Sequence, residues 1–315
     1  MMRAVRITET GGPEVLAVTD GPEPVAGDGE LLVDVAVAGV NFIDTYHRKG
    51  AYPIPLPFVL GVEGVGRVVG TGERVAWAEP LGSYAERIAV PADKTVPVPD
   101  TLSDEQAAGA LLQGMTAHAF TVDAFSVQPG QDVLVHAAAG GLGQQLTQLA
   151  SARGARVIGT VSTPEKAELA RSAGAAEVVN YSEVGDVAGA VRELTGGAGV
   201  HVVYDGVGAT TFDGSLAAVR RRGMVVLCGA ASGPVPPVDP QRLNAAGSVY
   251  LTRPKLFDYV ASPEELRTRA AAVYAAVADG SLAVRIGGRY RLEDVRQAHE
   301  DLEGRRTTGK LLLTV

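Results

Sequence analysis

The first hundred residues consist of short β-branched runs that are broken by glycine and proline. These runs span residues 31–37, 64–69, 74–76 and 84–90. Apolar runs of this length between turn-forming residues are typical of strands, whereas helices need longer stretches with a helical period. The pattern predicts a mostly β domain from Arg3 to about Pro99.

A different rhythm begins after residue 100. Residues 101–120 have helical spacing, and Ser103 is the expected N-cap in front of Glu105 and Gln106. Further along, apolar runs alternate with segments that fit helices, and the predicted strands cover residues 133–136, 156–160, 178–180, 200–204 and 224–229. This alternation predicts a parallel, doubly wound sheet, so the fold class is α/β.

The C-terminal tail contains both kinds of element. It has an Ala-rich helix at 263–279, a second helix within 290–303 and a closing strand at 310–315. We assign this tail to the N-terminal domain. Since 315 residues exceed a typical single domain, we predict a first domain of residues 1–112 and 256–315 and a second of 113–255.

Composition narrows the class of partner. The formal net charge is -8, which disfavours a general polyanion binder because affinity for a phosphate backbone rests on clustered Lys and Arg. We find neither a membrane-spanning apolar stretch nor a secretory signal at residues 1–7. Cys228 is the single cysteine, which excludes an intrachain disulfide and suits a reducing compartment. We expect a globular protein of the cytoplasm, with no nucleic acid as main partner and no membrane.

The Gly-rich turn at residues 137–143 carries most of the functional signal. An apolar run leads through three alanines to Gly140, Gly141, Leu142 and Gly143, and a helical stretch follows. In such a strand–turn–helix unit the glycines let backbone amides approach a pyrophosphate, and the helix N-terminus supplies partial positive charge. We interpret the turn as dinucleotide-binding, with a purely structural turn as the alternative.

The end of the second strand distinguishes the two nicotinamide cofactors. An NAD site usually places Asp or Glu about 20 residues after the glycines to bind the ribose hydroxyls. Here the chain has Ser162 and Thr163, followed by Lys166, which offer hydroxyl donors and a cation suited to a 2′-phosphate. NADPH is therefore favoured. The alternative is that Ser162 and Thr163 only cap the helix that begins at Pro164.

Several segments together carry a family resemblance. They are residues 39–46 (GVNFIDTY), 137–143, 178–181, 203–208 and 309–313. In these motifs and their order the chain resembles the quinone oxidoreductases, the zeta-crystallin-like branch of the medium-chain dehydrogenase/reductase superfamily. The resemblance implies a GroES-like, partly β catalytic domain plus a Rossmann domain that holds NADPH in the cleft. It also implies a homodimer whose interface uses sheet-edge strands around residues 225–228 and 248–252.

The resemblance assigns roles to individual residues. Asn41 and Tyr46 are expected at the nicotinamide end of the cleft, with Thr116 near it; these three are the predicted catalytic residues, and Asn41 and Thr116 also contact the cofactor. The other predicted cofactor-binding residues are Gly140, Gly141, Leu142 and Gly143 at the pyrophosphate, Ser162, Lys166 and Tyr181 at the 2′-phosphate, and Lys310 at the cofactor phosphates. Tyr46 and Tyr52 are the expected substrate-binding residues, with a packed loop aromatic as the alternative for Tyr52.

No metal is expected. The zinc alcohol dehydrogenases of this superfamily have a Cys where this chain has Asn41 and a His where it has Val62. The cysteines of their structural zinc lobe are also missing, because Cys228 stands alone.

The expected activity is that of an NADPH:quinone oxidoreductase, in which hydride or electrons pass to a quinone without a metal. A related NADPH-dependent reductase of enone or enoyl double bonds stays open, because the segment 66–77 lacks a loop that relatives usually carry and this leaves the substrate undetermined. A non-catalytic, NADPH-responsive structural or RNA-binding protein is the alternative from another class.

Overall fold

The computed structural model describes every residue from Met1 to Val315. The chain forms two compact units, of which the first comprises residues 1–115, 260–280 and 284–315 and the second residues 116–259 and 281–283. The boundaries predicted from sequence fall within helix α2 (Asp104–Ala119) and directly before Leu256. No helix has both the length and the apolar character that a membrane crossing requires.

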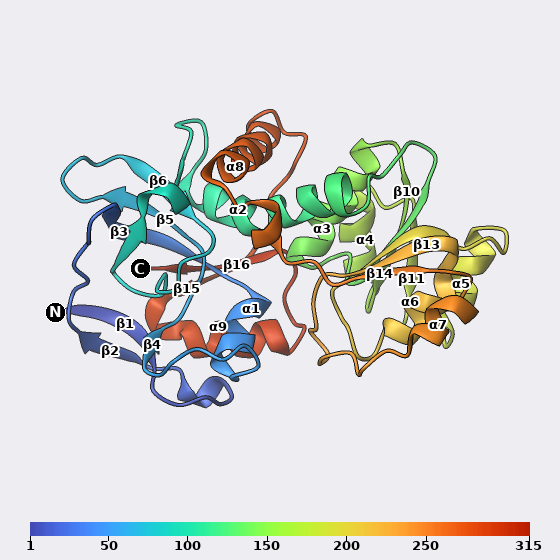
Figure 1. Ribbon diagram of the computed structural model, residues 1–315, viewed down its shortest axis with the longest axis horizontal. Helices are drawn as coiled ribbons and strands as arrows, with labels where there is room; N and C mark the ends of the chain where they lie inside the picture. Colours follow the sequence, from blue (N-terminus) through green and yellow to red (C-terminus); the bar gives the residue numbers. More distant parts are fainter. The chain divides into compact units, whose positions relative to one another are not determined.

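The second unit is built on a six-stranded parallel sheet with the order β11-β10-β9-β12-β13-β14 (Figure 1). Its strands are β9 (Asp132–Val135), β10 (Arg156–Val161), β11 (Glu177–Asn180), β12 (Val200–Asp205), β13 (Val219–Leu227) and β14 (Tyr250–Thr252). Its helices are α3 (Gly141–Ala152), α4 (Pro164–Ser172), α5 (Val187–Leu194), α6 (Phe212–Ala218) and α7 (Pro240–Ala245). The strand order reverses at β9 and β12, which is where such sheets bind ligands. The predicted doubly wound α/β fold is confirmed.

The first unit contains a seven-stranded sheet in which β15, β16, β3, β5, β6 and β8 follow in this order and β7 also pairs with β3. The strands of this sheet are β3 (Glu30–Val40), β5 (Gly64–Val68), β6 (Arg74–Trp77), β7 (Arg87–Pro91), β8 (Val96–Pro97), β15 (Ile286–Arg291) and β16 (Lys310–Thr314). A smaller sheet joins β1 (Met2–Ile7), β2 (Val18–Gly21) and β4 (Phe58–Val59). The helices are α1 (Phe42–Arg48), most of α2, α8 (Pro263–Ala278) and α9 (Val295–Glu303). The N-terminal part is therefore mostly β, as predicted.

Local sequence explains several of these elements. Ser103 accepts from the backbone N–H of Gln106 at 3.1 Å while the Gln106 side chain accepts from the backbone N–H of Ser103, so the expected N-cap of α2 is confirmed. Strands β5 and β6 form a tight hairpin in which Val68 donates to the carbonyl of Glu73 and Gly72 donates to that of Val68. This hairpin is the short connection that the sequence predicts at residues 66–77.

One predicted strand differs from the structure. β13 begins at Val219 rather than near residue 224, so the basic run Arg220, Arg221 and Arg222 lies in this strand. Hydrogen-bonded neighbours flank β13 on both sides, β12 and β14. The expectation that residues 225–228 form a sheet edge is therefore wrong. On this side of the sheet the edge strand is β14, which pairs only with β13.

Candidate functional site

The Gly-rich turn lies between β9 and α3 of the second unit. Gly140 has extended backbone and is the N-cap of α3, and its N–H donates to the carbonyl of Ala137 at 2.9 Å. A Cβ at Gly143 would lie 2.2 Å from the carbonyl oxygen of Ala137, far inside van der Waals contact. Ala137 itself has a φ of 52°. Helix and turn approach so closely that only glycine fits at position 143.

This turn has the properties of an anion site. Helix α3 extends over 12 residues and carries no acidic residue in its first turn. The first N–H groups of a helix have no partner within the helix, and together with the macrodipole they favour a negatively charged group at this end. The residues present therefore fit the pyrophosphate of a dinucleotide.

A buried polar network adjoins the Gly-rich turn. His136, the residue before Ala137, contacts the Thr160 hydroxyl through Nδ1 at 3.0 Å and the Ser215 hydroxyl through Nε2 at 3.1 Å. Ser215 donates to Asp205 Oδ2 at 2.7 Å, and burial lowers the pKa of His136 below its ordinary value. The network joins the ends of β9, β10 and β12 to α6.

The predicted 2′-phosphate residues meet at the carboxyl ends of two adjacent parallel strands. Ser162 directly follows β10 and Tyr181 directly follows β11, and the Tyr181 N–H donates to the carbonyl of Val161 at 3.0 Å. Lys166 Nζ lies 3.3 Å from Ser162 Oγ. The Lys166 ammonium and the Ser162 hydroxyl are therefore in contact, and Tyr181, which is 41% exposed, follows the adjacent strand.

The alternative for Ser162 and Thr163 is that they only cap helix α4, and the structure shows this capping for Thr163. Thr163 is the N-cap of α4, because its side chain accepts from the backbone N–H of Lys166 at 3.3 Å. Ser162 is not the cap, and its hydroxyl is directed to the Lys166 ammonium instead.

Thr116 is also part of the second unit and is buried on α2, with 9% of its surface exposed.

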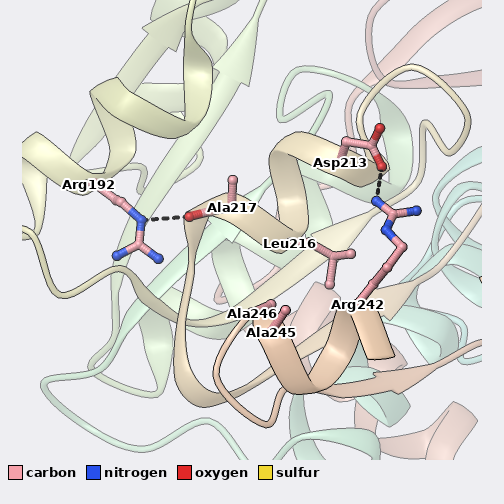
Figure 2. A pocket seen from close by; sticks show the side chains of 7 residues that line it. All are labelled: Arg192, Asp213, Leu216, Ala217, Arg242, Ala245 and Ala246. Carbon is pink, nitrogen blue, oxygen red and sulfur yellow. Dashed lines mark hydrogen bonds and ion pairs between the residues drawn. The ribbon is translucent and has the colours of Figure 1, made fainter. Parts of the chain in front are cut away.

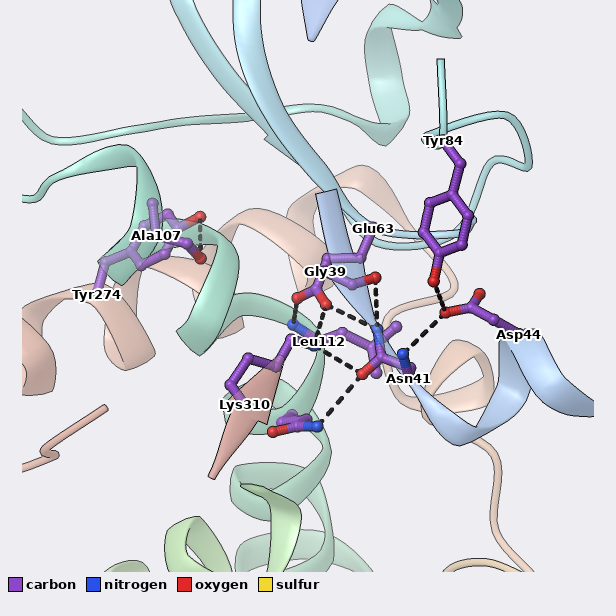
Figure 3. Close-up of polar contacts among 10 residues, drawn as sticks. Gly39, Asn41, Asp44, Glu63, Tyr84, Ala107, Leu112, Tyr274 and Lys310 are labelled. Carbon is purple, nitrogen blue, oxygen red and sulfur yellow. Dashed lines mark hydrogen bonds and ion pairs between the residues drawn. The ribbon is translucent and has the colours of Figure 1, made fainter. Parts of the chain in front are cut away.

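In the first unit, Asn41 is the centre of a buried polar cluster (Figure 3). It lies between β3 and α1, and its amide nitrogen donates to Glu63 Oε2 at 2.9 Å. Lys310 Nζ, at the start of β16, donates to Asn41 Oδ1 at 2.7 Å and to Glu63 Oε2 at 2.5 Å. The second oxygen of Glu63 accepts from the backbone N–H of Leu112 at 2.7 Å. All three side chains are almost completely buried.

A second carboxylate adjoins this cluster. Asp44 Oδ2 accepts from the backbone N–H of Asn41 and from the Tyr84 hydroxyl, both at 2.8 Å, while Asp44 Oδ1 is buried without a hydrogen-bond partner. Burial raises the pKa of Asp44 to about 7, although its hydrogen bonds and the Lys310 charge oppose this shift. Burial and the Asp44 charge also raise the pKa of Tyr84 well above its ordinary value.

The predicted substrate-binding tyrosines lie together. The rings of Tyr46, on α1, and Tyr52, in the following loop, pack edge to face with centroids 5.4 Å apart. Tyr52 is 43% exposed and also neighbours His47, whose pKa burial lowers. The first unit thus presents a partly exposed aromatic pair one turn of helix beyond Asn41.

The structure places the Lys310 side chain inside the first unit. This side chain is 1% exposed and its ammonium is bonded to Glu63 and Asn41, so a contact of Lys310 with cofactor phosphates stays a prediction. Glu63 and Gln113, whose side-chain nitrogen lies 3.3 Å from Asn41 Oδ1, are site residues that the sequence analysis missed. The sequence signal for Glu63 was that it is the single charged residue within the apolar run 58–66.

A surface hollow in the second unit has none of the predicted site residues in its lining (Figure 2). It is lined by Arg192, Asp213, Leu216, Ala217, Arg242, Ala245 and Ala246. Arg192 donates to three backbone carbonyls, and Arg242 pairs with Asp213. Because both guanidinium groups are already engaged, we assign no ligand to this hollow.

Fold and site define a medium-chain dehydrogenase/reductase. Residues 27–100 match the family described as "Alcohol dehydrogenase GroES-like domain", and residues 141–267 match the one described as "Zinc-binding dehydrogenase". The quinone oxidoreductase of Pseudomonas aeruginosa is 42% identical over 99% of both chains. The chain belongs to the quinone oxidoreductase family.

Two further comparisons concern cofactor and substrate. A mycobacterial protein solved in complex with NADPH is 52% identical over the full length of both chains, with a TM-score of 0.97. A 2-haloacrylate reductase from a Burkholderia species is 39% identical and is matched over 99% of each chain.

The zinc that the second family description mentions does not fit the residues present. The side-chain oxygens of Asn41 and Glu63 already bind the Lys310 ammonium, and Val62 has no donor atom. The chain has no group of three or more His, Cys, Asp or Glu residues that could hold a metal ion. We therefore derive no step through a metal.

Proposed function

We propose that this protein catalyses the NADPH-dependent reduction of quinones. The observation that carries the cofactor part is the corner formed by Ser162, Lys166 and Tyr181, because an ammonium and two hydroxyls replace the acidic residue of an NAD site. The full-length similarity to a quinone oxidoreductase supports the substrate part.

The chain's own residues bind and orient the reactants. When bound, NADPH supplies a hydride to the quinone, and the hydroquinone forms with one further proton from water. The backbone amides at Gly140–Gly143 would hold the pyrophosphate and the Lys166 corner the 2′-phosphate. Asn41 and Tyr46 would contact the nicotinamide and the quinone carbonyl and stabilise developing negative charge on oxygen, with Tyr52 packing on the quinone ring. Thr116 is proposed as a further contact at the nicotinamide.

The test is oxidation of NADPH and NADH by the purified protein with a benzoquinone or a naphthoquinone. Quinone turnover that prefers NADPH supports the proposal. Absence of oxidation with every acceptor would contradict it and favour a binding protein.

Reduction of an activated double bond is a second candidate. The specific observation is the similarity to the 2-haloacrylate reductase over nearly the whole chain. The same assay with 2-chloroacrylate and a 2-alkenal separates the two, because activity confined to these substrates assigns double-bond reduction.

We also propose a homodimer in the cytoplasm. Edge strand β14 has unpaired backbone groups on its outer side, and its Tyr250 is 61% exposed, so antiparallel pairing with a second copy would extend both sheets. Sedimentation velocity at micromolar concentration tests this, and a monomer would contradict it. Cell fractionation tests the location.

A further inference from the structure

The amide of Asn41 has no hydrogen-bonding capacity left. A side-chain amide offers two N–H donors and an oxygen with two lone pairs. The nitrogen lies 2.9 Å from Glu63 Oε2 and 3.3 Å from the Gly39 carbonyl, and the oxygen lies 2.7 Å from Lys310 Nζ and 3.3 Å from Gln113 Nε2.

These partners also fix which way the amide faces. An ammonium can only donate, so the atom of Asn41 that it contacts must be the oxygen, and the nitrogen must face the Glu63 carboxylate. Both short bonds involve a charged group, whereas the two bonds at 3.3 Å are long for their kind. A ligand that binds Asn41 would therefore exchange with Gly39 or Gln113 and leave Lys310 and Glu63 in place.

Two glycines, Gly39 and Gly109, lie near the Lys310 side chain. A Cβ at Gly39 would lie 2.2 Å from Glu63 Oε2 and 2.9 Å from Lys310 Cε. On α2, a Cβ at Gly109 would lie 2.6 Å from the Val284 side chain and 3.8 Å from Lys310 Cγ. Gly39 thus leaves the room that the Lys310 stem and the Glu63 carboxylate occupy, whereas the tight contact at Gly109 is with Val284.

We propose that Lys310 is a positioning residue for the reaction. Its buried ammonium, paired with Glu63, holds the Asn41 amide in one orientation, so that Asn41 presents one N–H and one oxygen lone pair to the reacting groups. The inference rests on the proposed quinone reduction, and its test includes a readout that needs no turnover.

The kinetic test compares Lys310→Met, Glu63→Gln and the double variant with wild type. The double variant removes both charges but keeps the side-chain volumes, so it is expected to fold even where a single variant leaves one buried charge unpaired. In Lys310→Met and in the double variant we expect kcat with a benzoquinone to fall about tenfold or more. The dissociation constant for NADPH should change less than about twofold, because the phosphate-binding residues lie on other elements.

Lys94→Met is the matched control. Lys94 also belongs to the first unit and pairs with Glu79, but its side chain is 31% exposed. An exposed pair contributes little, so the control should have wild-type kcat and wild-type affinity for NADPH.

The second readout is NMR of protein labelled with ¹⁵N-asparagine. The chain has only three asparagines, Asn41, Asn180 and Asn244, and the side-chain signal absent from Asn41→Ala assigns that residue. In wild type its amide protons should exchange with water more slowly than those of the other two, whose side-chain hydrogen bonds are exposed. Loss of Lys310 should speed this exchange about tenfold or more, while the signals of Asn180 and Asn244 stay unchanged.

Three outcomes would overturn the proposal. A rise in the NADPH dissociation constant with unchanged kcat would make Lys310 a phosphate ligand. Full activity of the double variant would show that Asn41 does not need the ammonium, and so would unchanged Asn41 exchange in Lys310→Met. If wild type does not reduce quinones, the proposed function fails, whereas the exchange experiment still decides whether Lys310 holds Asn41.

Discussion

The Lys166 ammonium lies 3.3 Å from the Ser162 hydroxyl, where β10 ends and α4 begins. Tyr181 follows the neighbouring strand β11, so three groups that can bind a phosphate share one end of the sheet.

Replacing Lys166 with alanine should weaken the preference for NADPH. A charge-assisted bond to phosphate is lost while NADH has no group there, so we expect the KM for NADPH to rise about tenfold and that for NADH to stay within about twofold. Steady-state kinetics with a fixed quinone measures both values. Lys255→Ala is the control, because Lys255 is an exposed lysine paired with Asp258 in the same unit. An equal loss with NADPH and NADH would exclude Lys166 from the 2′-phosphate site.

Replacing Gly143 with alanine should disrupt the pyrophosphate turn. The added Cβ would lie 2.2 Å from the Ala137 carbonyl oxygen, so turn and helix must separate. We expect a loss of about 1–3 kcal/mol in the free energy of unfolding and weak binding of NADPH. Urea denaturation and fluorescence titration measure the two effects. Gly214→Ala on α6 meets no atom within 4 Å and should be neutral or slightly stabilising; wild-type cofactor affinity in Gly143→Ala would contradict the assignment of the turn.

Asp44 should make stability depend on pH. Its pKa is raised from 3.8 to about 7, so the folded chain keeps a proton that the unfolded chain has already released. The contribution of this group is fully present below the unfolded pKa and is lost as the pH rises through the folded pKa. The groups that act on Asp44 are Tyr84, Asn41, Lys310 and Glu63.

The matching experiment is urea unfolding of wild type and Asp44→Asn from about pH 5 to about pH 8. The free energy of unfolding of wild type should fall more steeply with rising pH than that of the variant. Asp100→Asn, at an exposed position of the same unit, should retain the wild-type slope. Identical slopes for wild type and Asp44→Asn would show that Asp44 has an ordinary pKa.

Removing the Ser215 hydroxyl should destabilise the second unit. His136 Nε2 would lose its contact and Asp205 Oδ2 one of its donors, both in buried surroundings. An unsatisfied buried polar group costs about 1–3 kcal/mol, so the urea midpoint of Ser215→Ala should fall clearly. Ser126→Ala, whose hydroxyl accepts only an exposed bond from Gln128, should leave the midpoint unchanged. A wild-type midpoint in Ser215→Ala would show that the network contributes no stability.

Much of the fold follows from local pattern. The strand–turn–helix unit around Gly143, the N-cap at Ser103 and the hairpin at residues 66–77 were predicted because turn geometry and capping depend on residues a few positions apart. The order of strands in the sheet does not depend on residues a few positions apart. The family resemblance implies a sheet edge at residues 225–228, whereas β13 has neighbours on both sides.

The sequence by itself determined the α/β class, the pyrophosphate turn and the absence of an acid at the end of β10, since each is a short-range feature of residue type and spacing. Only the tertiary structure decided which groups Lys310 contacts. It lies 269 residues from Asn41 and 247 from Glu63 in the chain, and no local pattern encodes a contact over that distance. The contact forms because β16 pairs with β3, which ends at Val40, the residue before Asn41, so strand pairing and burial determine which charge meets which amide.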